Sequence, residues 1–243
     1  EAVGSGSGVF GDDDYDVVSL DSVSLQSDSD AADAELSIND DADVERHETL
    51  AVDLTSIQVD GVDLASSPYA SSLSIDTSSV VTIRNDDSGV ISISADQSAA
   101  EGDSGTTTVT YSVSGTAAVE AASGGFFGSS VSDGPAVGGA RDGGVDIGSN
   151  DYDVVAGSAG VVGAGWDGSA TDLVALDING DEVVEQDETI AIDLTSMPAD
   201  FDSLTLADGT TSALTFGDAV ASHTIENDDS GAFTVSAATD GAE

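Results

Sequence analysis

Apolar and polar residues alternate along several short stretches of this chain. The alternation runs through residues 50–54, 90–94, 107–113, 173–178 and 189–194. A period of two places the apolar side chains on one face, so each stretch predicts a half-buried β-strand. No stretch shows the spacing typical of an amphipathic helix, and residues rich in Gly, Ser and Asp separate the alternating stretches. The pattern therefore predicts an all-β chain.

The sequence also repeats itself, with an offset that grows from 137 to 142 residues along the chain. Three blocks recur in the same order: 14–18 as 151–155, 36–56 as 176–196, and 82–89 as 224–231. We interpret residues 1–87 as a repeat without its first strands, 88–229 as a complete repeat, and 230–243 as the opening strand of a following repeat. About seven short strands in each repeat favour a Greek-key β-sandwich. The short joint at residues 86–89 favours an extended rod.

The charge is strongly one-sided. The chain carries 48 acidic residues and a formal net charge of −45, and its only cations are Arg46, Arg84 and Arg141. Nucleic acid and anionic membrane surfaces are excluded as partners, because both need a basic surface. No apolar stretch is long enough for membrane insertion. Without cysteine there is no disulfide and no thiolate chemistry.

So acidic a surface repels itself unless salt screens it or cations bind it. We therefore expect an extracellular or cell-surface protein of a saline or calcium-rich environment.

Four motifs occur in a fixed order, and three of them occur twice. They are Asp-Tyr, an acidic loop with Glu-x-x-Glu leading into a strand, Thr-Ile-x-Asn-Asp-Asp-x-Gly, and Ala-Glu-Gly-Asp-Ser-Gly at residues 100–105. In this order they resemble the Calx-beta repeat, a family that includes calcium-binding domains of sodium–calcium exchangers and repeats of large adhesive proteins. The resemblance implies tandem immunoglobulin-like Greek-key β-sandwiches with Ca²⁺ bound by acidic loops at one tip.

Carried over position by position, the resemblance implies a set of metal ligands in each repeat. In the second repeat these are Glu101, Asp151, Asp181, Glu185, Glu188, Asp228 and Asp229, and in the first repeat Asp14, Asp41, Glu45, Glu48, Asp86 and Asp87. Calcium takes six to eight oxygen ligands, so several carboxylates must converge. Two departures from the family pattern, Asn in place of the first acid of each triplet (Asn85, Asn227) and Gly180 in place of an acid, indicate fewer or weaker sites.

Other interpretations of the acidic residues stay open. The acidic loops could serve salt adaptation alone, with no specific calcium site. Residues 177–188 imitate an EF-hand loop, but Glu182 takes the place of its required glycine and the flanks are strand-like. His47 and His223 fall at different positions of the repeat and suit ordinary structural roles. No nucleophile–base set accompanies the paired carboxylates, so we expect no enzyme.

We expect a non-enzymatic structural module: calcium-stiffened tandem repeats in a filament, surface layer or large adhesin. Its partners would be neighbouring copies or repeats of itself, and strand donation is one way in which they could be joined. One alternative is an adhesin module that recognises a surface glycan or protein through the Gly-rich loop 124–148, where Phe126 and Phe127 stand together. Another is the accessory region of a secreted enzyme.

Overall fold

The computed structural model describes residues 6–7, 13–19, 35–54, 56–59, 62–68, 70–72, 76, 78–96, 98–133, 151–155, 160–184 and 186–236. Within these ranges β-strands are the main regular structure, and the only helical elements are one helical turn, η1 (Leu64–Ser66), and one short helix, α1 (Ala199–Asp202). Neither helix has the length and apolar character needed to cross a membrane. The predictions of an all-β chain and of strands in all five alternating stretches are confirmed.

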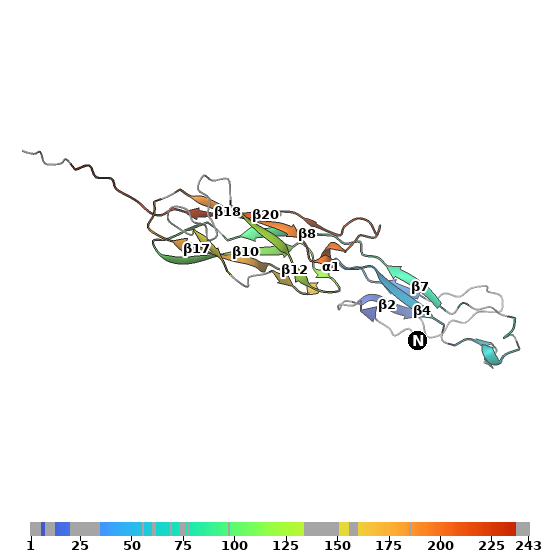
Figure 1. Cartoon of the computed structure of the whole chain (residues 1–243). Helices are drawn as coiled ribbons and strands as arrows, with labels where there is room; N and C mark the ends of the chain where they lie inside the picture. Colours follow the sequence, from blue (N-terminus) through green and yellow to red (C-terminus); the bar gives the residue numbers. More distant parts are fainter. Residues whose placement is uncertain are drawn as a thin grey trace, which may run out of the picture.

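The molecule is elongated (Figure 1). We call the described residues from Gly6 to Ile83 the N-terminal arm and those from Gly89 to Glu226 the two-sheet body. The strands of the arm are β1 (Gly6–Ser7), β2 (Asp13–Ser19), β3 (Glu35–Ile38), β4 (Glu48–Asp53), β5 (Gln58–Val59), β6 (Val62–Asp63) and β7 (Ser78–Ile83).

Two sheets form the body. One has the strand order β14 (Tyr152–Val154), β17 (Thr171–Gly180), β10 (Gly105–Gly115), β8 (Gly89–Ala95), β19 (Leu214–Phe216). The other has the order β13 (Gly128–Asp133), β18 (Glu188–Ser196), β20 (Val220–Glu226), β9 (Ala99–Ala100). Short pairs join β11 (Val119–Glu120) to β16 (Gly165–Trp166), and β12 (Gly125–Phe126) to β15 (Val161–Val162). Most neighbouring strands are antiparallel, but β19 with β8 and β20 with β9 are parallel.

One apolar core lies between the two sheets. The alternating residues of β8, β10 and β17 meet those of β18 and β20 there, and Tyr111 donates a hydrogen bond across the core to the carbonyl of Ile190 (3.2 Å). Phe127, Trp166 and Phe201 form a buried aromatic group, with ring centroids 5.9–6.2 Å apart. Phe126, its neighbour in the chain, is exposed. Burial of this core is the main favourable term for the body.

The arm pairs its strands as the body does. Tyr15 lies opposite Ile38 in β2–β3, as Tyr152 lies opposite Ile178 in β14–β17. The pair β4–β7 has the same register as β18–β20. No described strand of the arm corresponds to β8 or β10, so Ile38 is 48% exposed whereas Ile178 is 1% exposed. The sequence repeat therefore extends to the backbone register, while described apolar side chains of the arm such as Ile38 and Val80 stay exposed.

The arm joins the body through its acidic loop, residues 39–47. Val44 lies in this loop and is completely buried in the core of the body. The amide of Val44 donates to the carbonyl of Ala118 (3.0 Å), and the amide of Glu120 donates to the carbonyl of Val44 (2.9 Å). These bonds form a parallel bridge with Val119. Burying one valine contributes about 1.5–3 kcal/mol, so Val44 is the principal apolar contact of the joint.

Two arginines support the same joint. Arg46 forms an ion pair with Asp200 (3.0 Å), and Arg84 donates to the carbonyl of Ala207 (2.8 Å). Both are partly or largely exposed, and such surface contacts contribute between 0 and about 1 kcal/mol each. The arginines therefore orient the joint, whereas Val44 supplies most of its stability.

The Val44→Asp variant tests this assignment. A carboxylate is not tolerated in the core, so we expect the loop to leave the body and the free energy of unfolding to fall by about 1.5–3 kcal/mol in urea denaturation. Val184→Asp is the matched control, because Val184 occupies the equivalent position of the repeat and is 56% exposed. Equal stability of the two variants would contradict the assignment.

Candidate metal centre

Three predicted ligands meet where β9 and β20 end. The two strands pair in parallel, Ile225 with Ala99 and Glu226 with Ala100, so the residues that follow them leave the sheet together. The amide of Glu101 donates to the carbonyl of Glu226 (3.2 Å), and the amide of Gly102 donates to Oδ1 of Asp228 (3.1 Å). Parallel pairing therefore brings Glu101 beside Asp228 and Asp229, although they are more than 120 residues apart in the chain.

One carboxylate oxygen from each of Glu101, Asp228 and Asp229 lies within 4.8 Å of the others. Among the described residues no other group of three or more such side chains comes this close. Glu101 is buried, Asp229 is half-buried and Asp228 is exposed. Calcium is held by carboxylate oxygens 2.3–2.6 Å away, so three oxygens at this spacing can share one cation, with carbonyl groups or water as further ligands.

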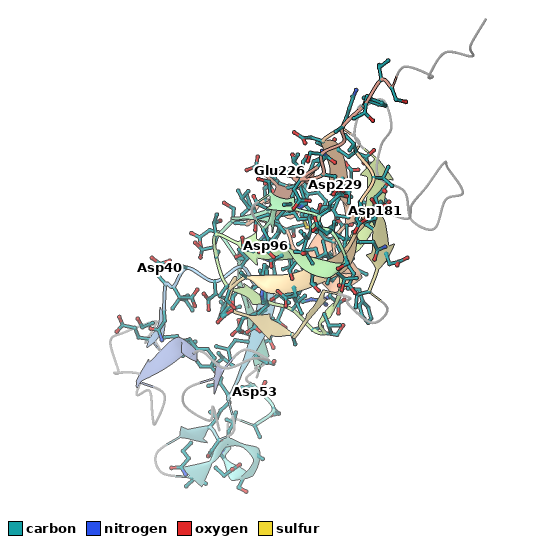
Figure 2. All side chains as sticks on the ribbon, turned by 90° about the vertical axis from the view of Figure 1, so that its left-hand side faces the viewer. Asp40, Asp53, Asp96, Asp181, Glu226 and Asp229 are labelled. Carbon is teal, nitrogen blue, oxygen red and sulfur yellow. The ribbon has the colours of Figure 1, made fainter. Side chains whose placement is uncertain are left out.

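Burial and the charges of neighbouring carboxylates both act on Asp229. Desolvation raises the pKa of its carboxyl above the usual 3.8, and the charges of Asp103, Asp228, Asp181 and Glu182 raise this pKa further. Its Oδ2 atom is shielded from solvent and accepts no hydrogen bond. Figure 2 looks along the long axis of the molecule and shows Asp229 and Asp181 near one another, with Asp40 well apart. A carboxylate that is desolvated and repelled in this way is one that a bound cation would stabilise.

Gly180 has a steric role that the sequence did not reveal. A Cβ at this position would lie 2.6 Å from the carbonyl oxygen of Glu101 and closer still to that of Gly102. Its lack of a side chain therefore lets the end of β17 approach the backbone that carries Glu101. We interpreted Gly180 from the sequence only as a lost acid, whereas the structure shows that it is also needed for this approach.

The two asparagines that begin the acidic triplets fix the turn after the last strand of each repeat. The amide of Asn85 accepts from the backbone N–H of Asp87 through Oδ1 (3.2 Å) and donates to the carbonyl of Asp87 through Nδ2 (3.1 Å). Asn227 likewise donates through Nδ2 to the carbonyl of Asp229 (3.2 Å). An aspartate could accept here but could not donate, so the asparagine departures follow from this geometry.

Asn85 also connects the arm to the body. Its side chain is buried, its Oδ1 accepts from the backbone N–H of Glu45 (3.4 Å), and its Nδ2 donates to the carbonyl of Thr205 (3.2 Å). Its own backbone N–H donates to Nδ1 of His47 (3.1 Å). A neutral side chain that both donates and accepts thus holds the linker against loops on both sides. Asn recurs at the same place in both repeats, but its partners across the joint come from distant segments, so this role was not predicted from the sequence.

A second acidic group surrounds this first joint. Desolvation raises the pKa of Asp87 above 3.8, and the charges of Asp86, Asp41, Asp40 and Asp43 raise it further. The backbone N–H of Asp43 donates to Oδ1 of Asp41 (2.8 Å), which shapes the loop. Asp41 and Asp86 thus lie near Asp87, although the described side chains do not converge as tightly as those of Glu101, Asp228 and Asp229.

The remaining predicted ligands whose side chains the structure describes stand outside the tight cluster. Asp151 precedes β14 and accepts through its carbonyl from the backbone N–H of Asn179 (2.9 Å). Glu188 is buried at the start of β18, and its counterpart Glu48 is half-buried at the start of β4. Glu45 is half-buried in the loop at the joint. Glu185 and the side chain of Asp14 lie outside the described residues.

The structure excludes the EF-hand alternative for residues 177–188. Asp177 and Asn179 belong to β17, and Glu188 opens β18, so strands flank the segment in place of helices. Asp177 accepts a hydrogen bond from Thr108 (2.6 Å), and Asn179 donates one to Asp153 (3.2 Å). These side chains are engaged along the sheet, which is incompatible with an EF-hand loop.

The chain matches no protein-family model, and no curated protein matches its sequence. The resemblance to the Calx-beta repeat therefore stays a prediction based on the residues quoted above.

The Gly180→Ala variant tests the close approach of β17 to the cluster. Because the added Cβ would collide with the backbone of Glu101 and Gly102, we expect a loss of about 1–3 kcal/mol in the free energy of unfolding. Gly163→Ala is the control, since a Cβ there meets nothing within 4 Å. Thermal unfolding of the two variants compares them directly, and equal midpoints would refute the steric role of Gly180.

Proposed function

We propose that this chain is a non-enzymatic structural module of an extracellular filament, surface layer or adhesin. In this proposal the arm and the body belong to successive immunoglobulin-like sandwich repeats, and Ca²⁺ binds at their acidic ends. The observation that carries the proposal is the cluster of Glu101, Asp228 and Asp229, whose carboxylate oxygens lie within 4.8 Å of one another.

The geometry of the cluster supports a cation site in preference to an acidic surface patch. Glu101 is buried, and the shielded Oδ2 of Asp229 accepts no hydrogen bond. Leaving such carboxylates close together costs free energy, and a divalent cation removes that cost. Carboxylates and backbone carbonyls are hard oxygen ligands, and in a cysteine-free chain this chemistry favours Ca²⁺ over zinc.

A mechanical role follows from where the acidic groups lie. Asp87 and the aspartates around it lie at the linker between arm and body. The Glu101–Asp228–Asp229 cluster lies at the opposite end of the body, where the chain leaves β20 (Figure 1). A cation at either place would tie the linker to loops of the adjoining unit. Bending at the linker would then require separating the ligands from the ion, so the array would stiffen when calcium is bound.

The Asp229→Asn substitution should leave stability unchanged or raise it in chelator, and should lower stability relative to the native chain in calcium. Without calcium the variant loses a repelled carboxylate, so its melting temperature should equal or exceed that of the native chain. With calcium at 100 times the dissociation constant, the native chain should gain about 2.7 kcal/mol per site, whereas the variant should gain much less. Calorimetry at constant high ionic strength separates this binding from general screening.

Asp218→Asn is the matched control, because it makes the same change in net charge at an exposed residue outside the cluster. It should respond to calcium as the native chain does. If calcium changes the stability of none of the three proteins, or stabilises all three by the same amount, the cluster is not a calcium site. The first of these results would favour salt adaptation without a specific site.

A further inference from the structure

The acidic loop at the end of the body that carries Glu101, Asp228 and Asp229 has the same local structure as the loop that joins the arm to the body. Asp181 Oδ1 accepts from the backbone N–H of Val183 (2.6 Å), as Asp41 accepts from that of Asp43. Asp187 Oδ1 accepts from the backbone N–H of Asn227 (3.1 Å), as His47 accepts from that of Asn85. The two loops therefore share their local structure, not only their sequence.

The glycine two positions after each acidic triplet also lies against the equivalent valine of its acidic loop. A Cβ on Gly89 would lie 3.6 Å from Cγ2 of Val44, and a Cβ on Gly231 would lie 3.4 Å from Cγ2 of Val184. The backbone path from the acidic loop to the next strand is thus alike at both ends of the body.

The two ends of the body differ in what the equivalent apolar side chains pack against. Val44 is completely buried against the body, whereas its counterpart Val184 is 56% exposed. Ile91 and Ile93 of β8 lie in the core, whereas their counterparts Phe233 and Val235 are fully exposed. The segment from Gly231 to Ser236 pairs with no described strand, and it extends away from the body in Figure 1.

We propose that Val184, Phe233 and Val235 form a docking surface for a further two-sheet unit of the same build as residues 89–226. Val184 packs into the core of that unit as Val44 packs into the body, and its backbone pairs with the strand corresponding to β11. Phe233 and Val235 take the places of Ile91 and Ile93 in its first strand. The first joint, already formed in this structure, is the template for the second.

The choice of occupant follows from the alternation and the charge of the surface. Phe233 and Val235 are separated by one residue, so they lie on the same face of an extended strand, which suits insertion into a sheet. The surface is flanked by Asp181, Glu182, Asp187 and Asp228, so a partner at this end must tolerate acidic neighbours. The end of the body around Val119 already tolerates acidic neighbours, because Val119 pairs with Val44 of the loop 39–47, which carries three aspartates.

The inference rests on the proposed function as a structural module, but it does not depend on calcium. The experiment uses the chain 1–243 and an extended chain in which a second copy of residues 102–229 follows Glu243. Glu243 stands where Glu101 stands in the repeat, so residues 231–243 lead into the added copy as residues 89–101 lead into the body. Amide hydrogen exchange is measured on both proteins in excess calcium and again in excess chelator.

In the extended chain we expect the amides of Phe233, Val235 and Val184 to exchange at least 100-fold more slowly than in the chain 1–243. Val184→Asp should abolish this protection at position 184 and lower the melting temperature of the added copy. The same substitution should leave the chain 1–243 unchanged. Val183→Asp is the control, because it introduces the residue found at the equivalent place of the first joint, Asp43, and it should be neutral in both proteins.

The inference is overturned if the added copy folds while Phe233, Val235 and Val184 exchange as fast as in the chain 1–243. It is also overturned if the added copy fails to fold, because the extended chain supplies every strand that the inference requires. Loss of the calcium response with intact protection would refute the metal site alone. Loss of protection with an intact calcium response would refute the docking surface alone.

Discussion

Mutual repulsion among carboxylates is the constraint on which the rest of this structure depends. With 48 acidic residues and three arginines, ion pairs can neutralise only a small part of the charge. The Arg46–Asp200 ion pair offsets little of this charge, so the joint relies mainly on a buried valine and on hydrogen bonds. Val44 and Asn85 supply these contacts at the junction of arm and body. Where carboxylates lie close together, as at Asp229, a bound cation would stabilise them.

The fold also brings carboxylates together at the two ends of the body. Along the sheets, alternation leaves every second position free to be polar, and carboxylates there can lie opposite one another, as Asp153 lies opposite Asp177. At the ends, loops from several strands converge, so their charges come together whatever their separation in sequence. Glu101 and Asp228 meet because β9 and β20 pair in parallel. Repulsion at such a place suits a cation-dependent joint, since adding or removing the ion changes its stability.

Much of the fold was predictable from the sequence, because strand alternation and repetition are both local signals. The five expected strands are present, and the two repeats share their strand registers. The sequence motifs also named Glu101, Asp228 and Asp229, and these three side chains do come together. Three features were not predictable: the steric need for Gly180, the linking role of Asn85 and the burial of Val44. Each depends on a contact between segments far apart in the chain, which a pattern of neighbouring residues does not encode.

The central claim is that a calcium ion is held by the carboxylates at the end of β20. The most direct measurement is anomalous X-ray diffraction from crystals of the chain grown in saturating calcium. The account predicts an anomalous peak 2.3–2.6 Å from carboxylate oxygens of Glu101, Asp228 and Asp229. Ordered electron density for these three side chains with no such peak between them would contradict it.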